Sequence, residues 1–200
     1  ELEPRGSKQI ERDDLVSTVA AQVNKANKDG GKTVHFLGEE DDDPSKISDW
    51  VGTGSTLLDV RISNRRDGGL PVGRMVEYNG LEGTGKSLLV AHTLANTQKK
   101  GGVAAMIDTE NSAAPDFWKA VGVDLKNLLY IPADTVEECF SSLEAIIGSV
   151  RKSNKDRLVT IAVDSVAGAS TRAELESEHG KDGYNTGKSI IISKAMRKIT

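Results

Sequence analysis

The chain has 200 residues, of which 37% are hydrophobic and 28% charged, with a formal net charge of −4 at pH 7. This is a soluble globular composition with enough residues for a three-layer core, and the acidic balance excludes a general attraction to nucleic acid, so that a DNA contact requires a local basic patch. The single cysteine, Cys139, excludes an internal disulfide, and no apolar run approaches the roughly 18 residues of a membrane helix. We expect a reducing compartment and no membrane partner.

The first part of the chain predicts a helix and a strand outside the main domain. Apolar residues recur at helical spacing between Asp13 and Lys28, and residues 33–37 have the composition of a lone strand. Five consecutive carboxylates at residues 39–43 are typical of a solvated linker. We therefore divide the chain into residues 1–43 and a main domain over residues 44–200. From pattern alone, the helix and strand either dock on a neighbouring subunit or pack on their own domain.

A phosphate-binding loop is predicted next. Residues 74–79 have the pattern of a short apolar strand, residues 80–87 match the full phosphate-loop motif, and residues 87–99 predict a helix. The glycines let successive N–H groups line an anion-sized hollow, while Lys86 reaches the β/γ-phosphates and the Ser87 hydroxyl meets Mg²⁺. The alternative is an ordinary glycine-rich turn. The residues expected to hold ATP here are Gly80, Leu81, Glu82, Gly83, Thr84, Gly85, Lys86, Ser87 and Leu88.

The rest of the chain alternates strand and helix patterns. Apolar runs of strand length occupy residues 103–108, 128–131 and 158–164, and helical patterns cover residues 115–121 and 136–150. This alternation predicts an α/β fold with a mostly parallel central sheet flanked by helices. The sequence from Thr135 to Glu138 is a capping box for the last of these helices, and Cys139 falls on its apolar face, so we expect that cysteine in the core.

Carboxylates follow two of the predicted strands at the edge where parallel sheets bind ligands. Asp164 is expected to hold Mg²⁺ together with Ser87, although a carboxylate at a strand end can also be a helix cap. Asp108 and Glu110 follow the other strand. A carboxylate there can orient and polarise the attacking water, and pattern alone leaves both candidates open, as well as a solvated loop.

A mobile loop and a basic helix are predicted at the end of the chain. Residues 177–187 contain three glycines, and residues 188–200 have helical periodicity with an apolar face and several cations. Such a loop beside such a helix can hold single-stranded nucleic acid through phosphate contacts and base stacking. Taken alone, a solvated helix face is the better interpretation. The candidate DNA contacts are Lys181, Tyr184, Lys188 and Arg197.

Several motifs together resemble the RecA-type recombinase family of bacteria and phages, including the phage UvsX branch. The similarity runs from about Leu15 to the end of the chain through residues 68–74, 107–110, 163–167, 173–176 and 193–198. The resemblance implies a RecA-like phosphate-loop ATPase that uses ATP and Mg²⁺. It also implies binding of single-stranded and double-stranded DNA, strand exchange in recombination and repair, and a cytoplasmic location in a bacterial cell or a phage-infected host. The N-terminal helix and strand would dock on the next protomer of a helical filament.

The resemblance also assigns roles to individual residues. It favours Glu110 over Asp108 as the catalytic carboxylate, makes Phe117 the residue that stacks on adenine, and makes residues 177–187 the first DNA-binding loop. Ala114 stands where the family commonly has an adenine-contacting Asp. The family's γ-phosphate-sensing strand and second DNA loop would lie beyond Thr200, so we expect a fragment of a longer protein.

Two other functions fit part of the pattern. A phosphate-loop nucleotide kinase needs a lid of arginines, and no arginine cluster follows Asp164 before Arg197. A non-catalytic assembly module would bind ATP tightly without releasing phosphate.

Overall fold

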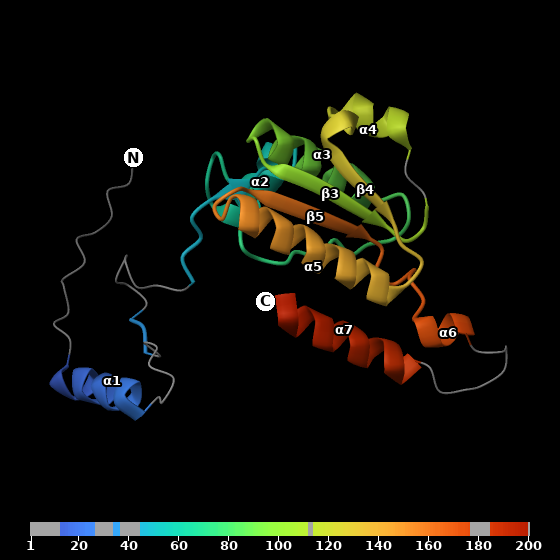
Figure 1. Cartoon of the computed structure of the whole chain (residues 1–200). Coiled ribbons are helices and arrows are strands. Elements are labelled where there is room, and N and C mark those ends of the chain that lie inside the picture. Colours follow the sequence, from blue (N-terminus) through green and yellow to red (C-terminus); the bar gives the residue numbers. More distant parts are fainter. Residues whose placement is uncertain (1–12, 27–33, 37–44, 112–113, 177–184, 200) are drawn as a thin grey trace. The chain divides into compact units, whose positions relative to one another are not determined.

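The structure is a computed structural model that describes residues 13–26, 34–36, 45–111, 114–176 and 185–199 (Figure 1). The chain divides into two compact units, residues 1–46 and residues 47–200. Within these described ranges, no helix combines the length and the apolar character needed to cross a membrane.

The described residues of the first unit form a helix, α1, over Asp14–Ala26, which confirms the predicted amphipathic helix. The strand predicted over residues 33–37 is wrong for the part that the structure describes, because residues 34–36 have no regular structure. A strand forms only where its backbone has a ladder partner. The N–H of Val34 instead donates to the Asn24 Oδ1, at 2.9 Å. Thr33 and Leu37 lie outside the described residues.

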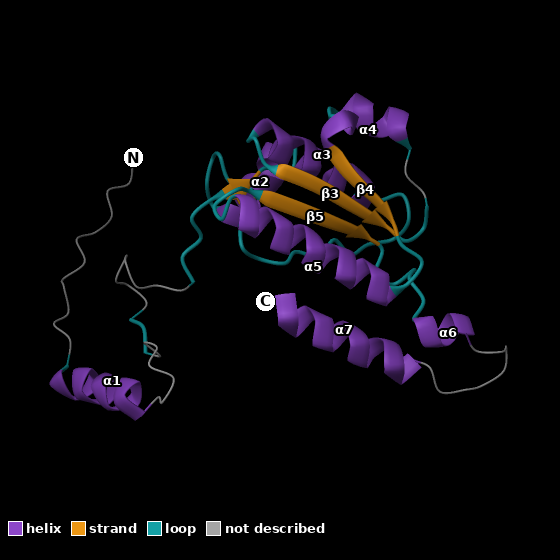
Figure 2. Cartoon of the chain, viewed as in Figure 1, coloured by secondary structure: helices purple, strands orange, loops and turns teal. Residues whose placement is uncertain are grey.

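The second unit is built on a three-stranded parallel sheet (Figure 2). Its strands are β3 over Val103–Asp108, β4 over Leu128–Pro132 and β5 over Val159–Asp164, in the order β4-β3-β5. The register pairs Asp108 with Pro132 on one side and with Asp164 on the other, so the three carboxyl ends finish at one edge. The predicted α/β fold with a parallel sheet flanked by helices is confirmed.

Helices cover both faces of this sheet. Helices α3 over Lys86–Lys99 and α4 over Pro115–Val121 cover one face, and α5 over Val136–Ser153 and α7 over Asn185–Ile199 cover the other. Side chains of a strand alternate between faces, so successive residues of β3 enter different cores. The first core contains Ala91, Leu94, Ala95, Ala104, Met106, Trp118 and Val123. The second contains Ile107, Ala133, Val136, Cys139, Phe140 and Ala169.

The sequence patterns explain how α5 and α7 form and pack. The predicted capping box of α5 is present: the Thr135 hydroxyl accepts from the Glu138 N–H at 3.1 Å, and the Glu138 carboxylate accepts from the Thr135 N–H. Cys139 is 4% exposed and belongs to the core, as expected. The apolar face of α7 packs against the second core through Ile191, Ile192, Ala195, Met196 and Ile199. Short helices lie at η1, Leu125–Asn127, and α6, Arg172–Glu176.

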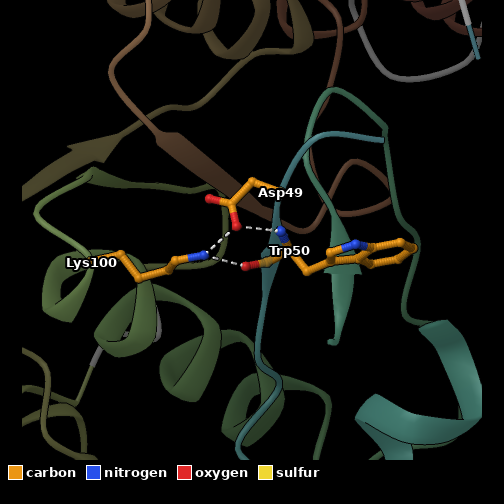
Figure 3. Close-up of polar contacts among 3 residues, drawn as sticks. All are labelled: Asp49, Trp50 and Lys100. Atoms are coloured by element: carbon orange, nitrogen blue, oxygen red, sulfur yellow. Dashed lines mark hydrogen bonds and ion pairs between the residues drawn. The ribbon is translucent and has the colours of Figure 1, made fainter. Parts of the chain in front are cut away.

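A small two-stranded antiparallel sheet precedes the parallel sheet. Strands β1 (Trp50–Val51) and β2 (Leu70–Pro71) pair antiparallel, and α2 (Thr56–Ser63) connects them. Glycine is required at position 69 in this small sheet, because the φ of Gly69 is +125° and a Cβ atom would lie 2.3 Å from the Val51 carbonyl oxygen. Lys100, just after α3, contacts the first of these two strands and the residue before it: its ammonium donates to the Trp50 carbonyl and pairs with the Asp49 carboxylate (Figure 3).

The segment that leads into the phosphate loop differs from the prediction. Residues 74–79 were expected to be a strand, but the structure gives them no regular structure. An apolar sequence forms a strand only when another strand lies beside it, and no described strand pairs with this one. Met75 and Val76 are accordingly 52% and 46% exposed.

Candidate active site

The phosphate loop turns directly into α3. Gly83 and Gly85 have φ values of +72° and +91°, a conformation that favours glycine. Gly85 is the N-cap of α3, and no side chain in the described parts of the chain caps the helix there. The first N–H groups of α3 and the positive end of its dipole are therefore directed at the loop, which is a favourable place for an anion.

The ammonium of Lys86 is held within the loop itself. It donates to the carbonyl oxygens of Gly80 and Leu81, at 2.9 Å each. The Thr84 hydroxyl donates to the same Leu81 carbonyl at 2.8 Å. Because an ammonium has three donors on a flexible stem, it can exchange these carbonyls for phosphate oxygens without a change of the loop's course.

Two oxygen ligands meet at the start of α3. The Ser87 hydroxyl donates to the Asp164 Oδ2 at 3.1 Å, which joins the first turn of α3 to the end of β5. Both are hard oxygen donors, the kind that Mg²⁺ prefers, and Mg²⁺ at phosphate sites is commonly held by one or two protein ligands plus water and phosphate oxygens. In the described ranges no group of three or more His, Cys, Asp or Glu side chains gathers as a metal site. The pair therefore suits a metal ion that arrives with a nucleotide.

The two carboxylates after β3 have different surroundings. Asp108 is fully buried, and its Oδ1 and Oδ2 accept from the Glu110 N–H at 3.0 Å and from the Tyr130 hydroxyl at 2.9 Å. Glu110 is exposed, and its Oε1 accepts from the Ser165 hydroxyl at 3.0 Å. An exposed carboxylate can meet a water molecule, whereas the Asp108 oxygens are directed at groups of the protein. The geometry thus favours Glu110 for the catalytic role.

Hydroxyl groups tie the ends of β3 and β5 together, and sequence reasoning missed them. The Thr109 hydroxyl donates to the Ser165 carbonyl at 2.7 Å and accepts from the Ser165 N–H at 3.0 Å. The Thr109 N–H donates to the Asp164 carbonyl at 2.9 Å. A signal was present, because both hydroxyl residues directly follow a strand-ending Asp. These bonds fix Glu110 and Asp164 on one rigid edge.

The remaining predicted residues that the structure describes come from α4 and α7, and Lys188 among them contacts the segment that follows β5. Phe117 lies on α4 and is 39% exposed, while its neighbour Trp118 enters the core. Lys188 donates to the Ala167 carbonyl at 2.8 Å. Arg197 is exposed on α7. The predicted DNA contacts Lys181 and Tyr184 lie outside the described residues.

Fold and site together define a protein of the α/β class with a phosphate loop at the carboxyl edge of its parallel sheet. The chain belongs to the RecA N-terminal domain family, whose model matches residues 16–200. It is 37% identical to a "Protein RecA" of Acidothermus cellulolyticus over 191 residues, which are 96% of this chain and 51% of that protein. It is also 37% identical to a "Protein RecA" of Prochlorococcus marinus over 198 residues, 98% of this chain and 48% of that protein. The chain spans about half the length of these curated relatives.

Proposed function

We propose that this chain is the ATP-binding part of a RecA-type recombinase, a DNA-dependent ATPase that assembles on single-stranded DNA and pairs it with homologous double-stranded DNA in recombination and repair. One observation carries the proposal. The phosphate loop, the Ser87–Asp164 pair and the exposed Glu110 meet at one edge of the parallel sheet. Membership of the RecA N-terminal domain family supports the same function.

Each residue of the candidate site would have its own role in ATP binding and hydrolysis. The loop N–H groups and Lys86 bind the β/γ-phosphates, and Ser87 and Asp164 hold the Mg²⁺ that enters with ATP. When bound, the metal ion neutralises charge on the phosphate oxygens. Glu110 orients and polarises the water that attacks the γ-phosphate, a contribution of about 10²–10⁴-fold in rate. Phe117 would stack on the adenine ring.

The DNA and filament contacts belong to other surfaces. We assign the DNA contacts to Lys181, Tyr184, Lys188 and Arg197, and the exposed position of Arg197 supports its part in this assignment. We assign the docking surface for the next protomer to α1 and the segment after it. Leu15, Val16, Val19 and Val23 of α1 are each more than 40% exposed, as expected of an apolar face that a partner covers. The proposed site of action is the cytoplasm, where the DNA is.

Phosphate release by the intact protein tests this function against its two alternatives. A recombinase releases phosphate from ATP and does so severalfold faster with single-stranded DNA. A nucleotide kinase instead responds to an added nucleotide acceptor, and an assembly module binds ATP without releasing phosphate at any DNA concentration. Lys86→Ala is the control that must abolish the activity, because contaminating ATPases do not depend on this residue.

A further inference from the structure

A phenol hydroxyl contacts the buried carboxylate two residues before the candidate catalytic residue Glu110. Tyr130 is on β4, where the register places it beside Met106, and the next paired position toward the carboxyl edge on the same face is Asp108. The Tyr130 hydroxyl donates to the Asp108 Oδ2 at 2.9 Å. The phenol therefore reaches along the sheet face toward the edge that carries Glu110.

Asp108 is also hydrogen-bonded to Glu110. Its Oδ1 accepts from the Glu110 backbone N–H at 3.0 Å, so one fully buried carboxylate is bonded to both the phenol and the Glu110 backbone. A buried charge is costly unless it is hydrogen-bonded, which makes the orientation of this carboxylate strongly dependent on its donors. Partial desolvation, together with the hydrogen bond to Asp108 and its charge, raises the pKa of Tyr130 above its ordinary value of 10.0.

The Glu110 side chain is held from its other end as well. Its Oε1 accepts from the Ser165 hydroxyl at 3.0 Å, and Ser165 follows Asp164 directly. A Cβ atom at Gly168 would lie 3.1 Å from the same Oε1, so the carboxylate is closely packed on that side. Glu110 is therefore held at both ends, at its backbone N–H by Asp108 and at its carboxylate by Ser165.

We propose that Tyr130 is a positioning residue for ATP hydrolysis: its hydroxyl orients the Asp108 carboxylate, which holds the Glu110 backbone and thereby keeps the Glu110 carboxylate in its contact with the Ser165 hydroxyl. This inference rests on the proposed function, because it assumes that Glu110 acts on the attacking water. Tyr130 itself touches no reacting atom. The competing explanation is that the phenol only satisfies a buried carboxylate and contributes to stability alone.

Tyr130→Phe, in the intact protein, tests the proposal because it keeps the ring and removes only the hydroxyl. We expect kcat for ATP hydrolysis to fall about 3- to 30-fold, as a small misplacement of a catalytic group does, with ATP affinity and KM unchanged within about twofold. Thr160→Val is the matched control. It removes a hydroxyl on β5 that shares a 2.6 Å hydrogen bond with Thr97, and it should lower stability without changing kcat.

The same substitution in a protein that already lacks the Glu110 carboxylate tests whether Tyr130 acts by positioning Glu110. In a Glu110→Gln protein, Tyr130→Phe should change kcat by less than about twofold, because a positioning residue has nothing left to position. The proposal is overturned if Tyr130→Phe leaves kcat unchanged, if ATP affinity falls in proportion to kcat, if Thr160→Val causes the same loss, or if the full loss persists in the Glu110→Gln protein.

An NMR measurement judges the contacts independently of activity. Tyr130→Phe should shift the backbone amide signal of Glu110 and speed its hydrogen exchange by about fivefold or more, because the bond to Asp108 weakens, whereas Thr160→Val should do neither. If the wild-type protein hydrolyses no ATP but the Glu110 amide responds in this way, the proposed function fails and the contact between Tyr130 and Glu110 stands. An unmoved Glu110 amide overturns the inference even in an active enzyme.

Discussion

The two ends of α3 are built differently. At its carboxyl end the chain satisfies its own polar groups: the Lys100 N–H donates to the Asn96 carbonyl, the Asn96 amide donates to the Gly52 carbonyl, and the Lys100 ammonium binds Asp49 and Trp50 (Figure 3). At its amino end no described side chain caps the helix.

The difference separates a helix end with a structural role from the end that we propose to bind the ligand. In the described residues, Lys86 at the amino end donates to loop carbonyls that phosphate oxygens could replace, and Ser87 is bonded to the Asp164 carboxylate, its proposed partner in holding a metal ion. Lys100 at the carboxyl end joins elements about fifty positions apart in sequence, and its contacts stabilise the fold. Lys86 at the start of α3 and Lys100 just after its end thus have different surroundings, and variants at the two ends should fail in different ways.

The largest effect is expected from Glu110→Gln, which should leave ATP affinity nearly unchanged and cut hydrolysis in the intact protein by about 10²-fold or more. Glutamine still hydrogen-bonds water but cannot accept its proton. Steady-state phosphate release and nucleotide titration measure the two quantities separately. Asp108→Asn is the comparison: a larger kinetic loss there than in Glu110→Gln would mean that Asp108 is the catalytic carboxylate.

Lys86→Ala should weaken ATP binding by about 10- to 150-fold, because a hydrogen bond to a charged group contributes about 1.5–3 kcal/mol. Calorimetric titration of ATP into the protein measures the loss. Lys99→Ala, in the last turn of the same helix, is the matched control and should bind ATP normally. Undiminished binding by Lys86→Ala would contradict the assignment of the phosphate loop.

The sequence predicted the carboxyl edge of the parallel sheet more completely than the segments around it. Asp164 and Glu110 could be placed because strands of a parallel sheet end at one edge and each carboxylate follows an apolar run. The structure distinguishes Asp108 from Glu110 by their surroundings: Asp108 is fully buried and bonded to Tyr130, 22 residues away along the chain, whereas Glu110 is exposed. A sequence pattern does not show contacts between positions so far apart. The prediction of a strand at residues 74–79 is wrong, because a strand forms only beside a partner strand. The composition of a segment does not show whether a partner strand will lie beside it.

A smaller effect is expected for DNA. Arg197→Ala should lower the affinity of the intact protein for single-stranded DNA severalfold and reduce the slope of log affinity against log salt by about 0.7, the value for one phosphate contact on a single strand. Fluorescence anisotropy between 50 and 200 mM salt measures both. Lys152→Ala, an exposed cation on α5, is the control. Equal losses from both variants would indicate a general charge effect and no contact by Arg197.

The smallest effect is expected at the carboxyl end of α3, from Asp49→Asn. Hydrogen bonds from the Lys100 ammonium and the Trp50 N–H hold the pKa of Asp49 below its ordinary value of 3.8. A lowered pKa adds stability above pH 3.8 that is lost as the pH falls through the folded-state value. The pair is about half exposed, so solvent screening limits its contribution to less than about 1 kcal/mol.

Urea denaturation of wild type and Asp49→Asn should therefore show a small difference in the free energy of unfolding at pH 7. This difference should shrink below pH 3.8 and in high salt, where the ion pair is screened. ATP affinity should be the same in both proteins, because the contact lies at the other end of α3 from Lys86. A loss of ATP affinity in Asp49→Asn would show that the two ends of the helix are coupled, and the separation between a structural end and a ligand-binding end would then be wrong.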